Sequence, residues 1–143
     1  MGTPCAGPAV HLPSQRVTIV LDSGGVSAIS GRPRRVAWLR TLGAWPPVVP
    51  APVLTECLTG DHRRDFHTNQ LLSICRVQAI DEVLARAGAR LRTDARRRGV
   101  SATDALVIAV AEHTSEAVVL TGDQADIEAL VAVAQRPITV HPV

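Results

Sequence analysis

The chain contains no lysine and no tyrosine, and its large aromatic side chains are limited to Phe66, Trp38 and Trp45. Aliphatic side chains must therefore build the core, and they make up most of the 46% of residues that are hydrophobic. A core of Val, Leu, Ile and Ala is typical of a compact α/β protein. At 143 residues, the chain is long enough for one domain with a sizeable core.

Long apolar runs and paired cysteine motifs are also missing. No stretch approaches the roughly 20 apolar residues that a membrane-spanning helix needs. Residues 1–15 lack the charged start and the continuous apolar stretch of a secretory signal. Cys5, Cys57 and Cys75 form no CxxC pair, which argues against a disulfide framework and against zinc bound by thiolates. We therefore expect a cytoplasmic protein without a membrane segment.

All 15 basic residues are arginines, although the net charge of +2 is too small to indicate a partner. The planar guanidinium fork of arginine suits phosphate recognition better than an ammonium group does. Two interpretations remain open for the densest stretch, a solvated helix face or a surface that holds an RNA backbone. The six arginines of this stretch are Arg86, Arg90, Arg92, Arg96, Arg97 and Arg98.

Short apolar runs alternate with helical patterns from residue 17 onward, whereas residues 1–16 are rich in proline and glycine and show no periodicity. We predict a flexible N-terminal extension over 1–16 and one domain over 17–143. The alternation favours an α/β fold with an open parallel sheet of about five strands, flanked by helices on both faces. Strands are predicted at 17–21, 47–49, 75–80, 117–120 and 137–140, and helices at 26–29, 34–42, 51–58, 61–73, 81–97, 102–113 and 123–133.

Four acidic residues occupy comparable places in this pattern. Asp22 directly follows the first predicted strand, and Asp123 comes shortly after the fourth. Glu56 lies in the helix after the second strand, and Asp104 lies in the first turn of an alanine-rich helix. Ligands bind beyond the carboxyl ends of the strands in open α/β sheets. Carboxylates that gather there require neutralisation, and hard cations such as Mg²⁺ prefer all-oxygen sites.

Each of these residues also has a purely structural interpretation. Asp22 and Asp123 are suited to cap the helices that follow them. Ser101 and Asp104 fit a capping box at the start of their helix, and Glu56 is equally compatible with a solvent-facing position. Taken singly, the capping and functional interpretations are equally good, but the four carboxylates together favour a metal site.

Four segments in this order and spacing resemble the PIN domain, and in particular the VapC-type toxins of bacterial toxin–antitoxin pairs. They are VTIVLDS at 17–23, LTECLTG at 54–60, TDALVIA at 103–109 and VLTGDQAD at 119–126. The resemblance implies a five-stranded parallel sheet and an acidic site for Mg²⁺ or Mn²⁺, where a metal-activated water attacks an RNA phosphodiester bond. It also implies a homodimer and a VapB-type antitoxin, whose arm covers the cleft and often places an arginine among the carboxylates.

The resemblance assigns functions to individual residues as well. Asp22, Glu56, Asp104 and Asp123 match the acidic positions of the family that bind metal and carry catalysis. Asp126 matches a further acidic position of many members, and the hydroxyl residues Ser23 and Thr121 are similar to residues that line such sites. The implied activity is that of a metal-dependent endoribonuclease toxin.

Other functions fit the sequence less well. The segment after Asp22 lacks the GxGxxG pattern of a dinucleotide-binding site, and Gly24 stands where a phosphatase of the aspartyl-nucleophile type needs a second Asp. His62 and His67 are five residues apart, a spacing that does not align two imidazoles on one helix face. The alternative that stays open is a catalytically silent PIN-like module that binds RNA or protein. Gly24 and Gly25 also predict an unusually flexible turn after Asp22.

Overall fold

The computed structural model describes residues 17–143, so the predicted N-terminal extension lies outside the described residues. Its five strands form one parallel sheet in the order β3-β2-β1-β4-β5, which confirms the predicted open parallel sheet. The strands are β1 (Thr18–Leu21), β2 (Ala44–Pro50), β3 (Arg76–Gln78), β4 (Ala117–Thr121) and β5 (Ile138–Pro142).

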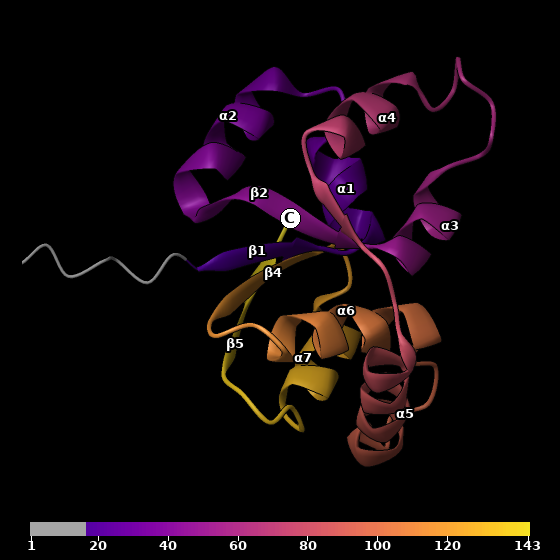
Figure 1. The fold of residues 1–143 in the computed structure, drawn as a ribbon, viewed down its shortest axis with the longest axis vertical. Helices are drawn as coiled ribbons and strands as arrows, with labels where there is room; N and C mark the ends of the chain where they lie inside the picture. The colour runs from indigo at the N-terminus through magenta and orange to yellow at the C-terminus, as the bar shows by residue number, and fades with distance from the viewer. Residues whose placement is uncertain (1–16) are drawn as a thin grey trace, which may run out of the picture.

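Helices cover both faces of the sheet, as Figure 1 shows. One face carries α1 (Ser23–Ile29), α2 (Pro33–Leu42), α3 (Leu54–Cys57) and α4 (Phe66–Ser73), with a 3-10 turn over Ala51–Val53 leading into α3. The other face carries α5 (Glu82–Ala95), α6 (Ala102–Glu112) and α7 (Gln124–Val131). None of these helices, within residues 17–143, has the length and apolarity to cross a membrane.

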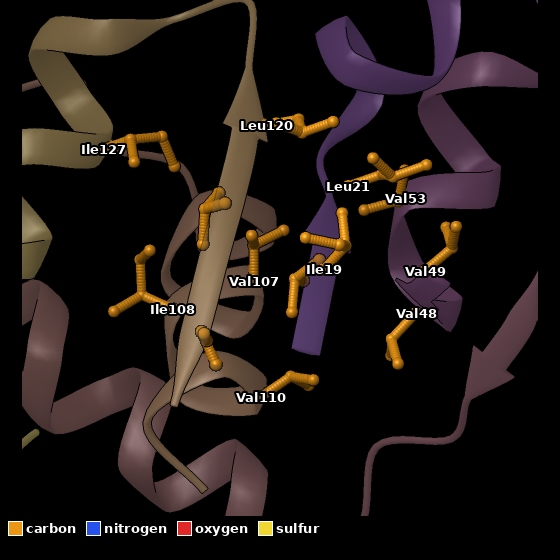
Figure 2. Close-up of a cluster of buried hydrophobic side chains, with 14 of the residues drawn as sticks. Ile19, Leu21, Val48, Val49, Val53, Val107, Ile108, Val110, Leu120 and Ile127 are labelled. Atoms are coloured by element: carbon orange, nitrogen blue, oxygen red, sulfur yellow. The ribbon is translucent and has the colours of Figure 1, made fainter. Parts of the chain in front are cut away.

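The core is centred on β1, which lies between β2 and β4, and on α6, which packs against β1 and β4. Ile19 and Leu21 of β1 and Val107 and Ile108 of α6 belong to one hydrophobic cluster with almost no solvent exposure (Figure 2). Burying each such side chain contributes about 1.5–3 kcal/mol, before the entropy cost of folding is subtracted. This packing fixes the end of β1 and the start of α6, where Asp22 and Asp104 lie.

The predicted helix over 61–73 is wrong in its first five residues, because α4 begins only at Phe66. The Asp61 carboxylate accepts hydrogen bonds from the backbone N–H groups of Arg63 and Arg64, at 2.9 and 3.3 Å. The buried Asp65 carboxylate accepts the N–H groups of Thr59 and Gly60. Side chains therefore satisfy backbone donors in this turn, which removes the local advantage of a helix.

Several other boundaries also differ from the sequence prediction: α1 begins at Ser23 instead of residue 26, β3 covers only Arg76–Gln78, β5 extends to Pro142, and α7 ends at Val131. Two further differences have a clear local cause. Strand β2 begins at Ala44 instead of Pro47, because Ala44 already pairs with Thr18 of β1. Helix α5 ends at Ala95 instead of Arg97, because Arg96 adopts a left-handed conformation with φ of 50°. The chain turns there, and the arginines that follow leave the axis of the helix.

Candidate metal centre

A cleft of about 320 Å³ lies at the carboxyl ends of β1 and β4. These neighbouring strands flank the point where the strand order reverses, the usual place for a ligand in an open α/β sheet. Four of the five predicted acidic residues meet here, and we name this site the acidic cleft. Its lining consists of Asp22, Ser23, Gly24, Glu56, Ser101, Asp104, Gly122 and Asp123.

Asp22 is both a helix cap and a wall of the acidic cleft. Its side chain is 3% exposed, and its Oδ1 accepts hydrogen bonds from the N–H groups of Gly25 at 2.7 Å and Gly122 at 3.4 Å. The Thr121 hydroxyl donates to the Oδ2 atom of Asp22. A carboxylate has about four lone-pair positions, so these three donors leave about one for a ligand. The predicted capping role is confirmed, and it orients the carboxylate for a site.

Burial raises the pKa of Asp22 above its usual range, because a low-polarity surrounding disfavours the charged form. Hydrogen bonds from Thr121, Gly25 and Gly122 oppose this shift without cancelling it, and the negative charge of Asp123 adds to it. Burial thus destabilises the ionised form of Asp22, and a nearby cation would stabilise it.

Asp104 is half-buried in the first turn of α6, where its backbone N–H donates to the Ser101 hydroxyl at 3.0 Å. This confirms Ser101 as the helix cap. Burial is the main cause that raises the pKa of Asp104, a hydrogen bond with the Ser101 side chain lowers it, and the charges of Asp22, Glu56 and Asp123 raise it. Carboxylates from three other parts of the chain therefore act on Asp104, as residues of one site do.

Asp123 and Asp126 extend the site along the first turn of α7. Asp123 is exposed and caps the helix by accepting the Asp126 N–H at 3.4 Å. One carboxylate oxygen from each of Asp104, Asp123 and Asp126 lies within 4.8 Å of the others. Asp126 does not line the acidic cleft and is bound by the Arg97 Nε at 2.5 Å, so it lies at the edge of the site. Asp22 and Glu56 stand outside this close group of three.

The sequence pattern of the PIN domain family matches residues 19–130, a segment that contains all five of these acidic residues. The chain belongs to the PIN-domain family. PIN domains are in general nucleases, so the family relationship assigns the chain to a group of hydrolases that cut nucleic acids. A comparison with curated proteins finds no match to this chain.

Solved structures of other proteins share the fold of this PIN domain. The structure of FitAB bound to an IR36 DNA fragment superposes with a TM-score of 0.60 at 23% identity, over 87% of this chain and 94% of that chain. FitAcB from Neisseria gonorrhoeae gives a TM-score of 0.57 at 22% identity, over 85% and 96% of the two chains. PAE2754 from Pyrobaculum aerophilum gives 0.55 at 17% identity, over 86% and 83%. At these identities the likeness concerns the fold.

The donor set of this PIN domain fits a hard divalent cation. All charged groups of the acidic cleft are carboxylates, and oxygens are the ligands that Mg²⁺ prefers. Two oxygens on opposite sides of one Mg²⁺ lie about 4.2 Å apart, which is close to the 4.8 Å limit for Asp104, Asp123 and Asp126. The oxygens of these three residues therefore lie near the spacing that a shared ion would require.

We predicted that Gly24 and Gly25 make the turn after Asp22 flexible. In the structure, these two glycines instead allow close packing between backbone segments. A Cβ atom on Gly24 would lie 2.5 Å from the Gly122 Cα, and one on Gly25 would lie 2.5 Å from the Leu120 carbonyl oxygen. Helix α1 therefore approaches the end of β4 backbone to backbone. This contact brings the Gly122 N–H and the Thr121 hydroxyl within reach of Asp22.

Sequence reasoning missed the positive neighbour of the acidic cleft. Arg97 binds Asp126 across 29 positions of the chain, and no local spacing rule connects residues so far apart. The same holds for Arg90, which donates to the buried Glu112 at 2.8 Å and so ties α5 to α6. The sequence analysis left a solvated helix face and an RNA-binding surface open for this stretch, and neither interpretation included these intramolecular partners.

We expect Asp104→Asn to raise the melting temperature of the metal-free protein at pH 7. Because the folded-state pKa of Asp104 is raised, its ionised form costs stability above that pKa, and this cost fades as the pH falls toward the ordinary value of 3.8. The difference between the variant and wild type should therefore shrink on acidification in EDTA. Glu128→Gln, at an exposed position of α7, is the control without such a gain. A variant that melts below wild type at pH 7 would show that the Asp104 carboxylate stabilises the fold.

Proposed function

We propose that this PIN domain is a metal-dependent endoribonuclease toxin of the VapC type. It hydrolyses RNA phosphodiester bonds with Mg²⁺ or Mn²⁺ held by Asp22, Glu56, Asp104 and Asp123. Asp126 contributes from the edge of the site. The observation that carries the proposal is the meeting of these four carboxylates in one cleft, with three of them raising the pKa of the fourth.

The proposed roles of the acidic residues differ with the number of hydrogen bonds that constrain each side chain. A divalent cation, when bound, supplies a Lewis acid for the phosphate and lowers the pKa of a bound water. Asp22 is fixed by three hydrogen-bond donors, which leave about one lone-pair position of its carboxylate for a ligand. Glu56 and Asp123 are exposed at the rim, where their carboxylates can turn toward a water and accept its proton. Ser23 adds a hydroxyl to the lining.

The proposal includes a VapB-type antitoxin, a second copy of the chain as homodimer partner, and a cytoplasmic location. The motif resemblance supports the two protein partners. One detail of the antitoxin proposal is an arginine of the partner that binds the carboxylates of the cleft. The Arg97–Asp126 pair supports this detail, since a guanidinium group of this chain already binds a carboxylate at the edge of the site. A partner's arginine placed deeper in the acidic cleft would neutralise the same charges in the same way.

The test is cleavage of total RNA by purified, partner-free protein in Mg²⁺, in Mn²⁺ and in EDTA. We expect discrete RNA fragments with either metal and none in EDTA, because without a cation the acidic cleft repels the phosphate backbone. Single-stranded DNA of the same sequence as a cleaved RNA shows whether the 2′-hydroxyl is required. Equal cleavage in EDTA would rule out the metal role, and a folded protein that cuts nothing with either metal would be the catalytically silent binding module.

A further inference from the structure

A second depression adjoins the acidic cleft, and its charge is opposite. Its volume is about 500 Å³, and its lining contains three arginines and no acidic residue. We name it the arginine hollow. It is lined by Ala89, Arg92, Thr93, Arg97, Arg98, Gly99 and Val100.

The arginine hollow and the acidic cleft share an edge. Val100 lines the hollow, and the next residue, Ser101, lines the cleft. Arg97 of the hollow binds Asp126, one oxygen of which lies within 4.8 Å of oxygens of Asp104 and Asp123. A strand of nucleic acid that has one phosphate in the cleft and runs toward Ser101 would bring its next phosphates to the hollow.

The end of α5 shapes the arginine hollow. The helix stops at Ala95, and the left-handed Arg96 and Gly99, with φ of 50° and 86°, turn the chain back. This turn brings Arg97 and Arg98 beside Arg92, which belongs to the last turn of the helix. The three arginines thus line one hollow, although the chain between them is not a continuous helix.

The partners of the arginines separate those with structural roles from those available to a ligand. Arg86 pairs with Glu82 on the exposed side of α5, and Arg90 pairs with the buried Glu112. Within residues 17–143, no ion pair involves Arg92 or Arg98, and both are exposed. The hollow therefore concentrates positive charge that intramolecular pairs do not neutralise.

We propose that the arginine hollow binds the phosphates of the RNA strand next to the cleavage site. This inference rests on the proposed nuclease function, and it names how the substrate is held. Arg92 and Arg98 would bind phosphate oxygens through the guanidinium fork, while Arg97 also keeps Asp126 in place. Contacts of this kind position a strand without reading its sequence. They also offset the repulsion between the acidic cleft and a polyanion.

The test measures binding of a fluorescein-labelled single-stranded RNA by anisotropy, in Mg²⁺ and at several salt concentrations. All proteins carry Asp104→Asn, so that the RNA stays intact. The double variant Arg92→Gln/Arg98→Gln should bind about 10-fold more weakly at about 0.1 M salt. The slope of log affinity against log salt should fall by about 1.4, which corresponds to two lost phosphate contacts on a single strand. The matched control Arg34→Gln/Arg86→Gln removes two exposed charges elsewhere and should change affinity less than about twofold.

The role of the arginine hollow would be overturned if both double variants lost the same RNA affinity. It would also be overturned if Arg92→Gln/Arg98→Gln left the slope of log affinity against log salt unchanged. Melting temperatures of all variants show whether a loss reflects unfolding, since exposed substitutions of this kind change stability by less than about 0.5 kcal/mol. The result also separates this inference from the nuclease proposal. If wild type cleaves RNA but the two double variants lose equal RNA affinity, only the role of the arginine hollow is overturned. If RNA binding requires Arg92 and Arg98 but wild type cleaves no RNA, the role of the hollow is supported and the nuclease proposal is overturned.

Discussion

Asp104→Asn is expected to lower the metal-dependent rate of RNA cleavage at least about 100-fold while the protein remains folded. Substitutions of residues that merely support a metal ligand cost about 10–100-fold in metal affinity or activity, and loss of a ligand itself should reach or exceed that range. Asparagine keeps the shape of the side chain and removes the charge that attracts the cation. Asp104 is the best residue for this test because its side chain is not the cap of α6, a role that belongs to Ser101.

Three further variants make the result specific to the site. Asp22→Asn should lose activity as severely, because Asp22 lines the acidic cleft and its carboxylate is held in place by hydrogen bonds to both oxygens. Asp126→Asn should lose less, because Asp126 lies outside the lining and already pairs with Arg97. Glu128→Gln removes a carboxylate from the exposed side of α7 and should cleave at the wild-type rate. Titration calorimetry with Mn²⁺ should show weakened binding in the same order.

Two outcomes would contradict the assignment. Wild-type cleavage by Asp104→Asn would mean that the carboxylates of the acidic cleft do not hold the catalytic metal. If Glu128→Gln lost as much cleavage activity as Asp104→Asn, the loss would come from the change in overall charge and not from the acidic cleft. The melting temperature decides whether a loss of activity is a loss of folding, since Asp104→Asn is expected to melt above wild type without metal.

The fold was accessible from sequence because its signals are local. Short apolar runs such as that over 17–21 need both faces buried, and parallel sheets bury both faces of their strands. Asp22 and Asp123 could be placed at one edge of the sheet because each follows a strand of a sheet predicted to be parallel, and the carboxyl ends of parallel strands meet at one edge. Their meeting in the acidic cleft follows from the pairing of β1 with β4.

What sequence reasoning missed depends on contacts between distant parts of the chain. The Thr121 and Gly122 donors reach Asp22 across 99 and 100 positions, and Arg97 reaches Asp126 across 29. Capping and metal binding also looked like competing interpretations of Asp22, although in the structure the same carboxylate caps α1 and lines the acidic cleft. The three donors on Asp22 still leave about one of its lone-pair positions for a ligand, so a cap is no argument against a site.

Gly25→Ala is expected to destabilise the protein by about 3 kcal/mol and to reduce cleavage by up to about 100-fold in the protein that remains folded. The new Cβ would lie 2.5 Å from the Leu120 carbonyl oxygen, in the backbone of β4, which cannot rotate away. Helix α1 must then move outward. Because the Gly25 N–H donates to Asp22 at 2.7 Å, that movement also displaces the carboxylate.

Gly88→Ala is the matched control, because it makes the same chemical change in α5, none of whose residues lines the acidic cleft. Its Cβ would meet the end of the Leu106 side chain at 3.0 Å, and that side chain can rotate. The better helix propensity of alanine, about 1 kcal/mol, offsets much of this contact. Urea denaturation of both variants measures the two stabilities. A Gly25→Ala protein as stable and active as wild type would show that α1 does not need its close approach to β4, and that Asp22 is positioned by Thr121 and Gly122 without it.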